Sequence, residues 1–349
     1  MPHTRPNITQ ARELYRPARV AQRIVNRESY GTPVTDRFYP ERTRDNWPDV
    51  MVPVEEITQN TLPVPLVLRG APGLSVSGDN GKISAIFPQP FKTVDGIGAT
   101  AWRNRQLLAG RQGLQADADR LMDRHIDIHR KSRESLAAQS LRGRVDYPIA
   151  GATGQIVDVF SVKYGDVHVW RPSVDWTAEA TTPGMIRKDL SNLRTERARR
   201  GYATTGIDIG RDLFASIYDR LSALGNDSRV QANVDEPGTI VLGGFRLMEM
   251  AGQVYHPGIA DFGQPGGAVE AGYKDVLGPT ELMATDENAP WRLLNVALDN
   301  FLLPDNPAPV GFILDMARDG SQIDVFVESK PFFVPPAPAI SIGDATNPA

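Results

Sequence analysis

Two histidines have a spacing that can hold a metal ion. His125 and His129 stand four residues apart in a stretch, Ala99 to Arg142, that contains no proline. Residues four apart share one face of a helix, so two imidazoles there could bind zinc. The intervening sequence is Ile-Asp-Ile, without the glutamate that follows the first histidine in zinc proteases. We therefore predict no metal site, and expect solvated or interfacial histidines that can respond to pH.

Other patterns associated with catalysis or phosphate binding are incomplete. The glycine-rich run from Gly263 to Gly267 lacks the lysine and hydroxyl residue of a phosphate loop. Ser75 and Ser77 do not form the Gly-x-Ser-x-Gly turn that exposes a nucleophile. Four aspartates lie near the C-terminus: Asp299, Asp305, Asp315 and Asp319. Their neighbours are turn residues, which favours turn and capping roles over acid-base work. No cofactor or catalytic residue is predicted.

Arginine is concentrated in two places. The first 44 residues carry nine arginines, no lysine and four acidic side chains. Such an arm can contact nucleic acid or an acidic partner, and arginine equally forms salt bridges between proteins. The second group ends a predicted helix: Arg194, Arg197, Arg199 and Arg200. These cations suit the helix dipole and could face nucleic acid, although a charge run is most often a solvated surface.

The composition limits the class of protein. The chain has 349 residues and no cysteine, which excludes disulfides, thiolate metal sites and cysteine nucleophiles. No segment approaches the roughly 20 apolar residues that span a bilayer, and no secretory signal is present. Hydrophobic residues make up 41%, and the length exceeds that of a usual single core. We expect a folded protein with at least two packed regions.

The sequence of the N-terminal third predicts an extended arm followed by a β-hairpin. Residues 1–48 read as an extended arm with one short helix from Pro17 to Asn26. Alternating apolar residues from Val50 to Lys92, interrupted by the turn signal Asn80-Gly81, predict a long β-hairpin. Neither element can bury its apolar side chains alone, so both must lie on something else.

A long helix is predicted next, most securely from Leu114 to Leu141, with Gly143 ending it. Gly110 and Gly113 make its first turns doubtful. Its expected buried stripe recurs every seven residues: Leu107, Leu114, Leu121 and Ile128.

The remaining chain reads as strands and two amphipathic helices. Strands are predicted at Val145–Tyr147, Gln155–Val162, Val167–Trp170, Thr239–Leu242, Gln253–His256, Val310–Leu314 and Gln322–Glu328. Helices are predicted at Met185–Arg199 and Arg211–Leu224, with a helix-prone segment at Trp291–Phe301. Regular structure is expected to end with Pro331 to Pro338. The fold class is α+β.

This order of elements resembles the Hong Kong 97 capsid fold of tailed bacteriophages. Short motifs are similar to those of the lambda-type major capsid proteins, the phage capsid E family. They are Arg27-Glu28-Ser29-Tyr30 with Phe38-Tyr39, Leu141-Arg142-Gly143-Arg144, Ala284-Thr285-Asp286-Glu287-Asn288 before Pro290-Trp291-Arg292, and Glu328-Ser329-Lys330-Pro331-Phe332. The resemblance implies an N-terminal arm (1–48), an E-loop hairpin (49–95), a peripheral domain with a spine helix (96–183), an axial domain (184–309), and closing strands with a C-terminal tail (310–349).

The resemblance also implies a function. Copies of the chain would assemble into hexamers and pentamers of an icosahedral virion head, built in the host bacterial cytoplasm, which expands as double-stranded DNA is packaged. Expected partners are a separate scaffolding protein, a portal protein, a decoration protein and packaged DNA, with no membrane. An encapsulin-like compartment shell and a soluble α/β enzyme are the alternatives. A shell that contains an enzyme instead of DNA would identify the encapsulin-like protein. A compact monomer with a polar-lined pocket would identify the soluble enzyme.

The residues expected to make subunit contacts lie in the hairpin and the arm. Val64, Leu66 and Leu68 would dock the hairpin on an adjacent subunit, and Arg16, Arg19 and Arg23 would hold the arm on another. Lys82 follows the hairpin turn, and the Hong Kong 97 prototype cross-links a hairpin lysine. Lambda-type relatives generally use a decoration protein instead, so a solubilising role for Lys82 is the simpler expectation.

Overall fold

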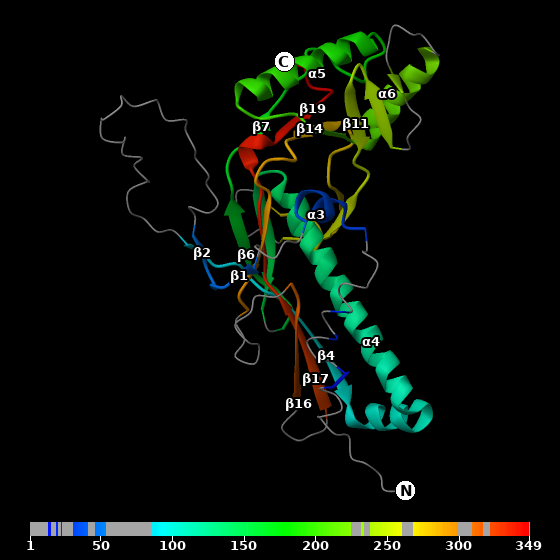
Figure 1. Ribbon diagram of the computed structural model, residues 1–349, viewed down its shortest axis with the longest axis vertical. Helices are drawn as coiled ribbons and strands as arrows, with labels where there is room; N and C mark the ends of the chain where they lie inside the picture. Colours follow the sequence, from blue (N-terminus) through cyan, green and yellow to red (C-terminus); the bar gives the residue numbers. More distant parts are fainter. Residues whose placement is uncertain are drawn as a thin grey trace, which may run out of the picture.

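The computed structural model is elongated, with a long helix and narrow sheets below a wider α/β body (Figure 1). The residues described are 13–14, 19, 22, 31–40, 46–53, 85–151, 153–224, 232–233, 238–259, 268–298, 309–316 and 322–348. Helices and strands mix along the chain, as the α+β prediction requires. Among the described residues, every helix is too short or too polar to traverse a bilayer.

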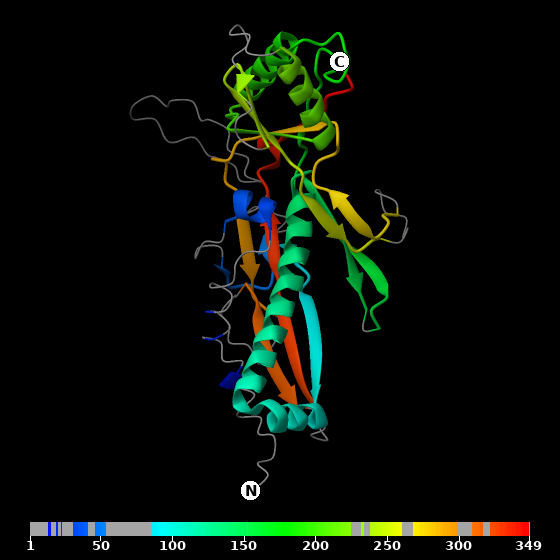
Figure 2. The same cartoon turned by 90° about the vertical axis from the view of Figure 1, so that its right-hand side faces the viewer.

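Helix α4 (Ala99–Ser140) forms the long axis. Its 42 residues correspond to about 63 Å at 1.5 Å per residue. The predicted helix is therefore confirmed but begins 15 residues earlier, since the segment containing Gly110 and Gly113 is also helical. Figure 2 shows these first turns bent away from the rest of the helix, a usual effect of closely spaced glycines. Gly143 follows the end of the helix with a φ of +75°.

The predicted seven-residue stripe of α4 is wrong at both ends. Leu107 is 70% exposed and Ile128 is 39% exposed, whereas Leu114 is buried. The buried stripe between residues 114 and 129 instead includes Leu114, Ala118, Met122, Ile126 and His129. They advance by three or four residues at a time, because a straight helix turns once in 3.6 residues and drifts about 20° per heptad away from a seven-residue repeat.

A three-stranded antiparallel sheet lies along the first half of α4. Its order is β16 (Gly311–Met316), β17 (Gln322–Ser329) and β4 (Phe91–Gly98). Val325 and Val327 face the helix and pack with Ala118 and Met122. The predicted closing hairpin is thus confirmed, and its partner strand β4 comes from more than 200 residues earlier in the chain.

Two predictions for the C-terminal region are wrong. The segment expected to be helix-prone, Trp291–Phe301, contains strand β15 (Arg292–Val296). Regular structure also continues past Lys330, with β18 (Pro331–Val334), the short 3-10 helix η3 (Ala337–Ala339) and β19 (Ser341–Asp344). β15 pairs with β18 and with β1 (Asn46–Trp47). A short, continuously buried apolar run has no period that separates helix from strand, and Pro331 is accommodated at the first position of an edge strand.

Three two-stranded pairs complete this body. β2 (Val52–Pro53) pairs antiparallel with β3 (Ala85–Ile86), so the two ends of the predicted long hairpin meet. β5 (Arg144–Ala150) pairs with β6 (Ile156–Lys163). β12 (Gln253–His256) pairs with β13 (Gly272–Asp275). Figure 2 shows the last two pairs, in green and yellow, on the same side of α4.

A seven-stranded mixed sheet forms the second body. Its order is β7 (His168–Val169), β19, β14 (Glu281–Thr285), β8 (Gly206–Ile209), β11 (Phe245–Glu249), β10 (Thr239–Leu242) and β9 (Ala232–Asn233). Helices α5 (Pro183–Arg199) and α6 (Arg211–Leu224) cover one face and confirm the two predicted helices. The C-terminal strand β19 joins this sheet, which brings the end of the chain back to the α/β body.

The helices pack on the sheet through aliphatic side chains. Leu190 and Leu193 of α5 and Ile217 of α6 are buried with Ile207 and Ile209 of β8. Trp170 and Trp176 join the same core, so the tryptophan-containing stretch before α5 packs against it. Because Ile207 and Ile209 point toward the helices, the alternation of a strand turns Asp208 toward the opposite face.

Candidate functional site

The two bodies meet at a short helix near the start of the described chain, α3 (Pro33–Phe38). Its Thr32 side chain bonds Asp36 instead of capping the helix. The cap comes from α4, where Glu134 accepts hydrogen bonds from the backbone N–H of Val34 (2.8 Å) and Thr35 (3.0 Å) and from the Thr35 hydroxyl (2.6 Å). Burial raises the pKa of Glu134, and these hydrogen bonds oppose the rise. A carboxylate at a helix N-terminus also suits the helix dipole.

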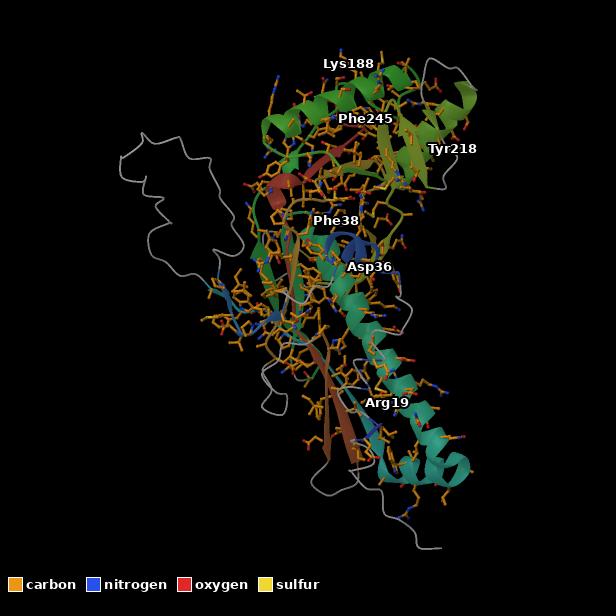
Figure 3. All side chains as sticks on the ribbon, in the orientation of Figure 1. Arg19, Asp36, Phe38, Lys188, Tyr218 and Phe245 are labelled. Carbon is orange, nitrogen blue, oxygen red and sulfur yellow. The ribbon has the colours of Figure 1, made fainter. Side chains whose placement is uncertain are left out.

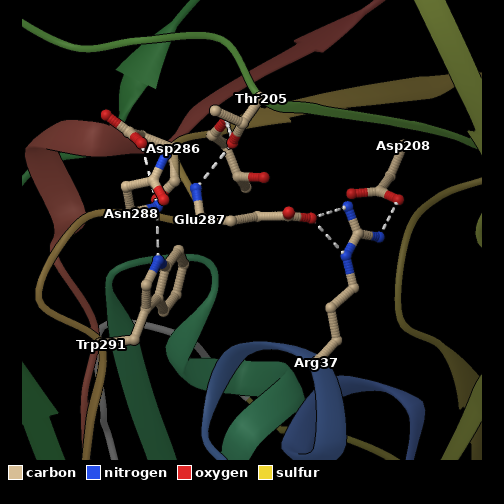
Figure 4. Close-up of polar contacts among 8 residues, drawn as sticks. Arg37, Thr205, Asp208, Asp286, Glu287, Asn288 and Trp291 are labelled. Atoms are coloured by element: carbon tan, nitrogen blue, oxygen red, sulfur yellow. Dashed lines mark hydrogen bonds and ion pairs between the residues drawn. The ribbon is translucent and has the colours of Figure 1, made fainter.

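The other end of α3 carries an ion pair to the seven-stranded sheet (Figure 4). Arg37 Nη1 lies 2.5 Å from Asp208 Oδ1, and Arg37 Nη2 lies 2.7 Å from Glu287 Oε1. Asp208 is 1% exposed. Burial raises the pKa of Asp208 to about 6, even though the Arg37 charge acts to lower it. Arg37 therefore compensates part of the cost of a carboxylate buried in the sheet.

Aromatic packing fixes α3 between these polar contacts. Phe38 and Tyr39 pack on Trp291, with ring centroids 4.8 and 5.5 Å apart. Tyr39 also meets Phe333 edge to face, and its hydroxyl is 2.7 Å from the Ser140 hydroxyl. We call Val34, Thr35, Arg37, Phe38 and Tyr39, with the residues that they contact, the α3 junction.

The loop between β14 and β15 holds the remaining member of the ion pair. Glu287 N donates to the Thr205 hydroxyl (2.8 Å), and Trp291 Nε1 donates to the Asp286 carbonyl (2.9 Å). Asp286 also accepts a hydrogen bond from the backbone N–H of Ala203. The contacts of Glu287 with Thr205 and of Trp291 with Asp286 are drawn in Figure 4, and they belong to the Ala284–Arg292 segment that carries one of the family-like motifs.

The predicted histidine pair lies inside the protein, so the expectation of solvated histidines is wrong for this chain. His125 is 3% exposed and His129 is 0% exposed. The Thr93 hydroxyl lies 2.8 Å from His125 Nδ1 and 3.1 Å from His129 Nε2, and the Ser329 hydroxyl lies 2.6 Å from His129 Nδ1. These contacts tie α4 to β4 and β17. Burial, with the neighbouring His125 and Arg133, lowers the pKa of His129 to about 4.

The predicted basic end of α5 divides into one buried residue and three exposed ones. Arg197 is 1% exposed. Its guanidinium donates to the carbonyls of Ala284, Ala339 and Ala203 and to the hydroxyls of Ser341 and Thr204. Burial lowers the pKa of Arg197 to about 10. It thus joins α5, β14 and the C-terminal segment, while Arg194, Arg199 and Arg200 remain exposed.

The other predicted site residues are only partly placed. Arg19 lies near α4, with Nη2 2.6 Å from Asp119 Oδ1 in the same chain (Figure 3 labels it). Asp315 is exposed in β16 opposite Asp324, and so does not lie in a turn. The following residues lie outside the described part of the chain: Arg16, Arg23, Val64, Leu66, Leu68, Ser75, Ser77, Lys82, Gly263 to Gly267, Asp299, Asp305 and Asp319.

Sequence reasoning missed the residues of the α3 junction. Asp208 interrupts the otherwise apolar buried strand Gly206–Ile209, which is a usable signal for a paired buried charge. Glu134 similarly precedes a short run of small and apolar residues, Ser135 to Ala138. Neither signal indicates Arg37 as the partner. Among the described residues, no group of three or more His, Asp or Glu side chains could hold a metal ion.

Comparison with known families identifies the chain. Residues 17–343 match the model of the family described as phage major capsid protein E. The chain belongs to this family. The resemblance found in the sequence is confirmed, and the chain is a structural capsid protein of a bacteriophage virion, not an enzyme.

Solved structures similar to this capsid protein share little sequence with it. A protein assigned as a prophage capsid protein from Escherichia coli CFT073 is 13% identical, with a TM-score of 0.45 over 74% of this chain and 78% of that one. A phage-related protein from Bordetella bronchiseptica RB50 is 12% identical, with a TM-score of 0.41 over 94% and 96%. The mature capsid of bacteriophage PhiM1 gives 13% identity and a TM-score of 0.40 over 84% and 81%. Among curated protein sequences, none matches significantly.

This capsid protein exposes several apolar side chains on its described surface. Val94 of β4 and Phe326 of β17 are direct cross-strand partners on the side of the sheet away from α4, and they are 59% and 38% exposed. Leu107 and Leu108 are exposed in the first turns of α4. Tyr255 and Tyr273 form an exposed edge-to-face pair on β12 and β13. Surfaces of this kind are common where proteins associate.

Proposed function

We propose that this protein assembles into the hexamers and pentamers of an icosahedral head that encloses double-stranded DNA, and that the shell expands during packaging. The family match over residues 17–343 carries the proposal. In this function the arm, hairpin, spine helix, peripheral domain and axial domain have the roles implied by the Hong Kong 97 resemblance. A separate scaffolding protein, a portal protein and a decoration protein are the expected partners, and the host bacterial cytoplasm is the place of assembly.

The α3 junction supports a mechanical role for the subunit. α3 contacts the spine helix through Glu134 and the seven-stranded sheet through Asp208, so one arm segment spans both bodies. A displacement of either body relative to the other would break charged hydrogen bonds that are shielded from water. Such bonds are worth more than neutral ones, and breaking them leaves buried charge unpaired. The α3 junction can therefore hold the two bodies in one relative orientation until other contacts replace these bonds.

The proposed hairpin contact follows from the position of its base. β2 and β3 pair through Val52 with Ile86 and Pro53 with Ala85. The segment between them therefore begins and ends at one place on the subunit. We propose that Val64, Leu66 and Leu68 between them dock on an adjacent subunit, and that Arg16, Arg19 and Arg23 help the arm to hold another. Lys82 is assigned a solubilising role near the hairpin turn.

Assembly is tested by sedimentation velocity and negative-stain microscopy of the full-length protein, with and without its scaffolding protein. The expected result is regular hollow shells or capsomer rings. A compact monomer under all conditions would contradict the proposal.

The hairpin contact is tested with two neighbouring substitutions. Leu66→Ser and Val67→Ser change residues on opposite faces of an extended strand. We expect Leu66→Ser to lower the yield of shells several-fold with unchanged thermal unfolding of the unassembled chain, and Val67→Ser to have a smaller effect. Equal yields for the two variants and the wild type would remove the proposed contact.

A further inference from the structure

The outward side of α5 carries a group of exposed cations. Five exposed residues define it, here named the α5 basic face: Arg187, Lys188, Arg194, Arg199 and Arg200. The Arg187 side chain lies against Gly243 in the turn between β10 and β11, and Arg200 directly follows the last residue of the helix. Figure 3 shows Lys188 on the side of the helix away from the sheet. This grouping of cations contrasts with the net charge of −4 for the whole chain.

Helix geometry arranges four of these cations in two rows, and Arg200, after the end of α5, belongs to neither. Arg187 and Arg194 are seven residues apart, which places them within about 20° around the axis and about 10.5 Å along it. Lys188 and Arg199 are eleven residues apart, also within about 20° and about 16.5 Å along the axis. The rows flank the small side chains of the exposed face, so a ligand can approach the helix between them.

Small and polar residues occupy the space between the rows. Ser191, Thr195 and Ala198 are exposed there, and the Thr195 hydroxyl donates to the Ser191 carbonyl at 2.8 Å. The exposed acid of α5, Glu196, lies at the edge of this face, with Oε2 3.9 Å from His168 Nε2. The face therefore presents several cations and little competing negative charge.

This chemistry suits nucleic acid better than another capsid subunit. Cores of protein interfaces are depleted in charge and enriched in aromatic residues, and the α5 basic face contains no aromatic side chain. Double-helical DNA presents one negative charge per roughly 1.7 Å of axis, and binding without sequence preference needs little beyond arginine and lysine. Four of the five cations are arginines, whose guanidinium can engage two phosphate oxygens at once.

We infer that the α5 basic face binds the phosphate backbone of double-stranded DNA and forms part of the inner wall of the shell. The inference rests on the proposed function and deepens it, because it names the surface of the subunit that meets the DNA. It also sets the orientation of the α/β body, with α5 toward the lumen and the opposite face of the sheet, which carries Asp208, toward the junction.

The test compares two triple variants of the full-length chain, kept unassembled at low concentration. Lys188→Gln, Arg194→Gln and Arg199→Gln together remove three charges from the face. Arg103→Gln, Arg120→Gln and Lys163→Gln remove three exposed charges elsewhere and serve as the control for net charge. Binding to a 30-base-pair duplex of random sequence is followed by fluorescence anisotropy over a range of salt concentrations.

The wild type is expected to bind with a slope of log affinity against log salt of about −4, as for four or five phosphate contacts. The face variant should lose at least tenfold in affinity and about 3 in the magnitude of that slope, while the control stays close to wild type. No binding by the wild type, or equal affinity and slope for both variants, would overturn the inference.

Assembly of the same variants separates this inference from the proposed function. Shells formed by the face variant, with weakened DNA binding, support a lumenal role. Loss of shells in the face variant alone would make α5 a contact between subunits and overturn the inference. If even the wild type forms no shells or rings, the proposed function fails, whatever the DNA-binding result.

Discussion

The Arg37 guanidinium lies 2.5 Å from the carboxylate of Asp208, although the two residues are 171 positions apart in the sequence. One belongs to a six-residue helix of the arm, and the other to the centre of a seven-stranded sheet. The arm is thus part of the folded subunit at this point as well as a proposed contact with neighbours. Two substitutions below test the energetics of this arrangement, and two more test other buried polar side chains.

Asp208→Asn should change how stability depends on pH. Because burial raises the pKa of Asp208 to about 6, the folded state binds a proton before the unfolded state does, and the wild type gains stability as pH falls from about 6 to 4. The variant lacks this gain. We expect the unfolding free energy of the variant, relative to wild type, to fall by about 3 kcal/mol over that range. Urea unfolding at several pH values measures this, and a constant difference would contradict it.

Glu134→Gln should loosen α3 from α4. The carboxylate accepts three hydrogen bonds, two of them from backbone N–H groups of α3. The glutamine amide keeps one acceptor oxygen, but its NH2 group faces a hydrogen-bond donor of α3. We therefore expect the unfolding free energy to fall by about 2 kcal/mol. Hydrogen exchange should accelerate in residues 31–40. Glu179→Gln, at an exposed position, is the matched control, and similar effects of both changes would argue against the cap.

His129→Gln should remove a source of acid sensitivity. Its pKa is lowered to about 4 by burial and by the charges of His125 and Arg133, so the unfolded state binds the proton first. The wild type therefore loses stability as pH falls from about 6.5 to 4, by up to roughly 3 kcal/mol. The variant, relative to wild type, should gain by this amount over the same interval in urea unfolding. Parallel pH profiles for the two proteins would exclude the effect.

Arg197→Met should be strongly destabilising. The change removes hydrogen bonds to three backbone carbonyls inside the protein and leaves those carbonyls without their donor. A loss of about 3 to 5 kcal/mol is expected. Arg199→Met, two residues later and exposed, should change the unfolding free energy by less than about 0.5 kcal/mol. Comparable losses in thermal or urea unfolding would show that Arg197 has no special structural role.

The sequence by itself determined the elements with strong local patterns and the protein family. Helices α5 and α6 and the strands at Thr239–Leu242 and Gln253–His256 have boundaries close to those predicted, because glycines and apolar periodicity define them locally. The family motifs were also readable, since they are contiguous. The pairing of β15 with β18 is long-range and left no such trace, since their short apolar runs fit more than one structure.

Only the tertiary structure decided which polar residues are buried. His125, His129 and Arg197 have sequence neighbours typical of solvated helices, yet each is covered by strands or segments distant in sequence. The partnership of Arg37 with Asp208 likewise depends on α3 lying where α4 meets the seven-stranded sheet. Burial of a polar side chain is a property of the packed chain, because the groups that exclude water and supply hydrogen bonds come from elsewhere in the sequence.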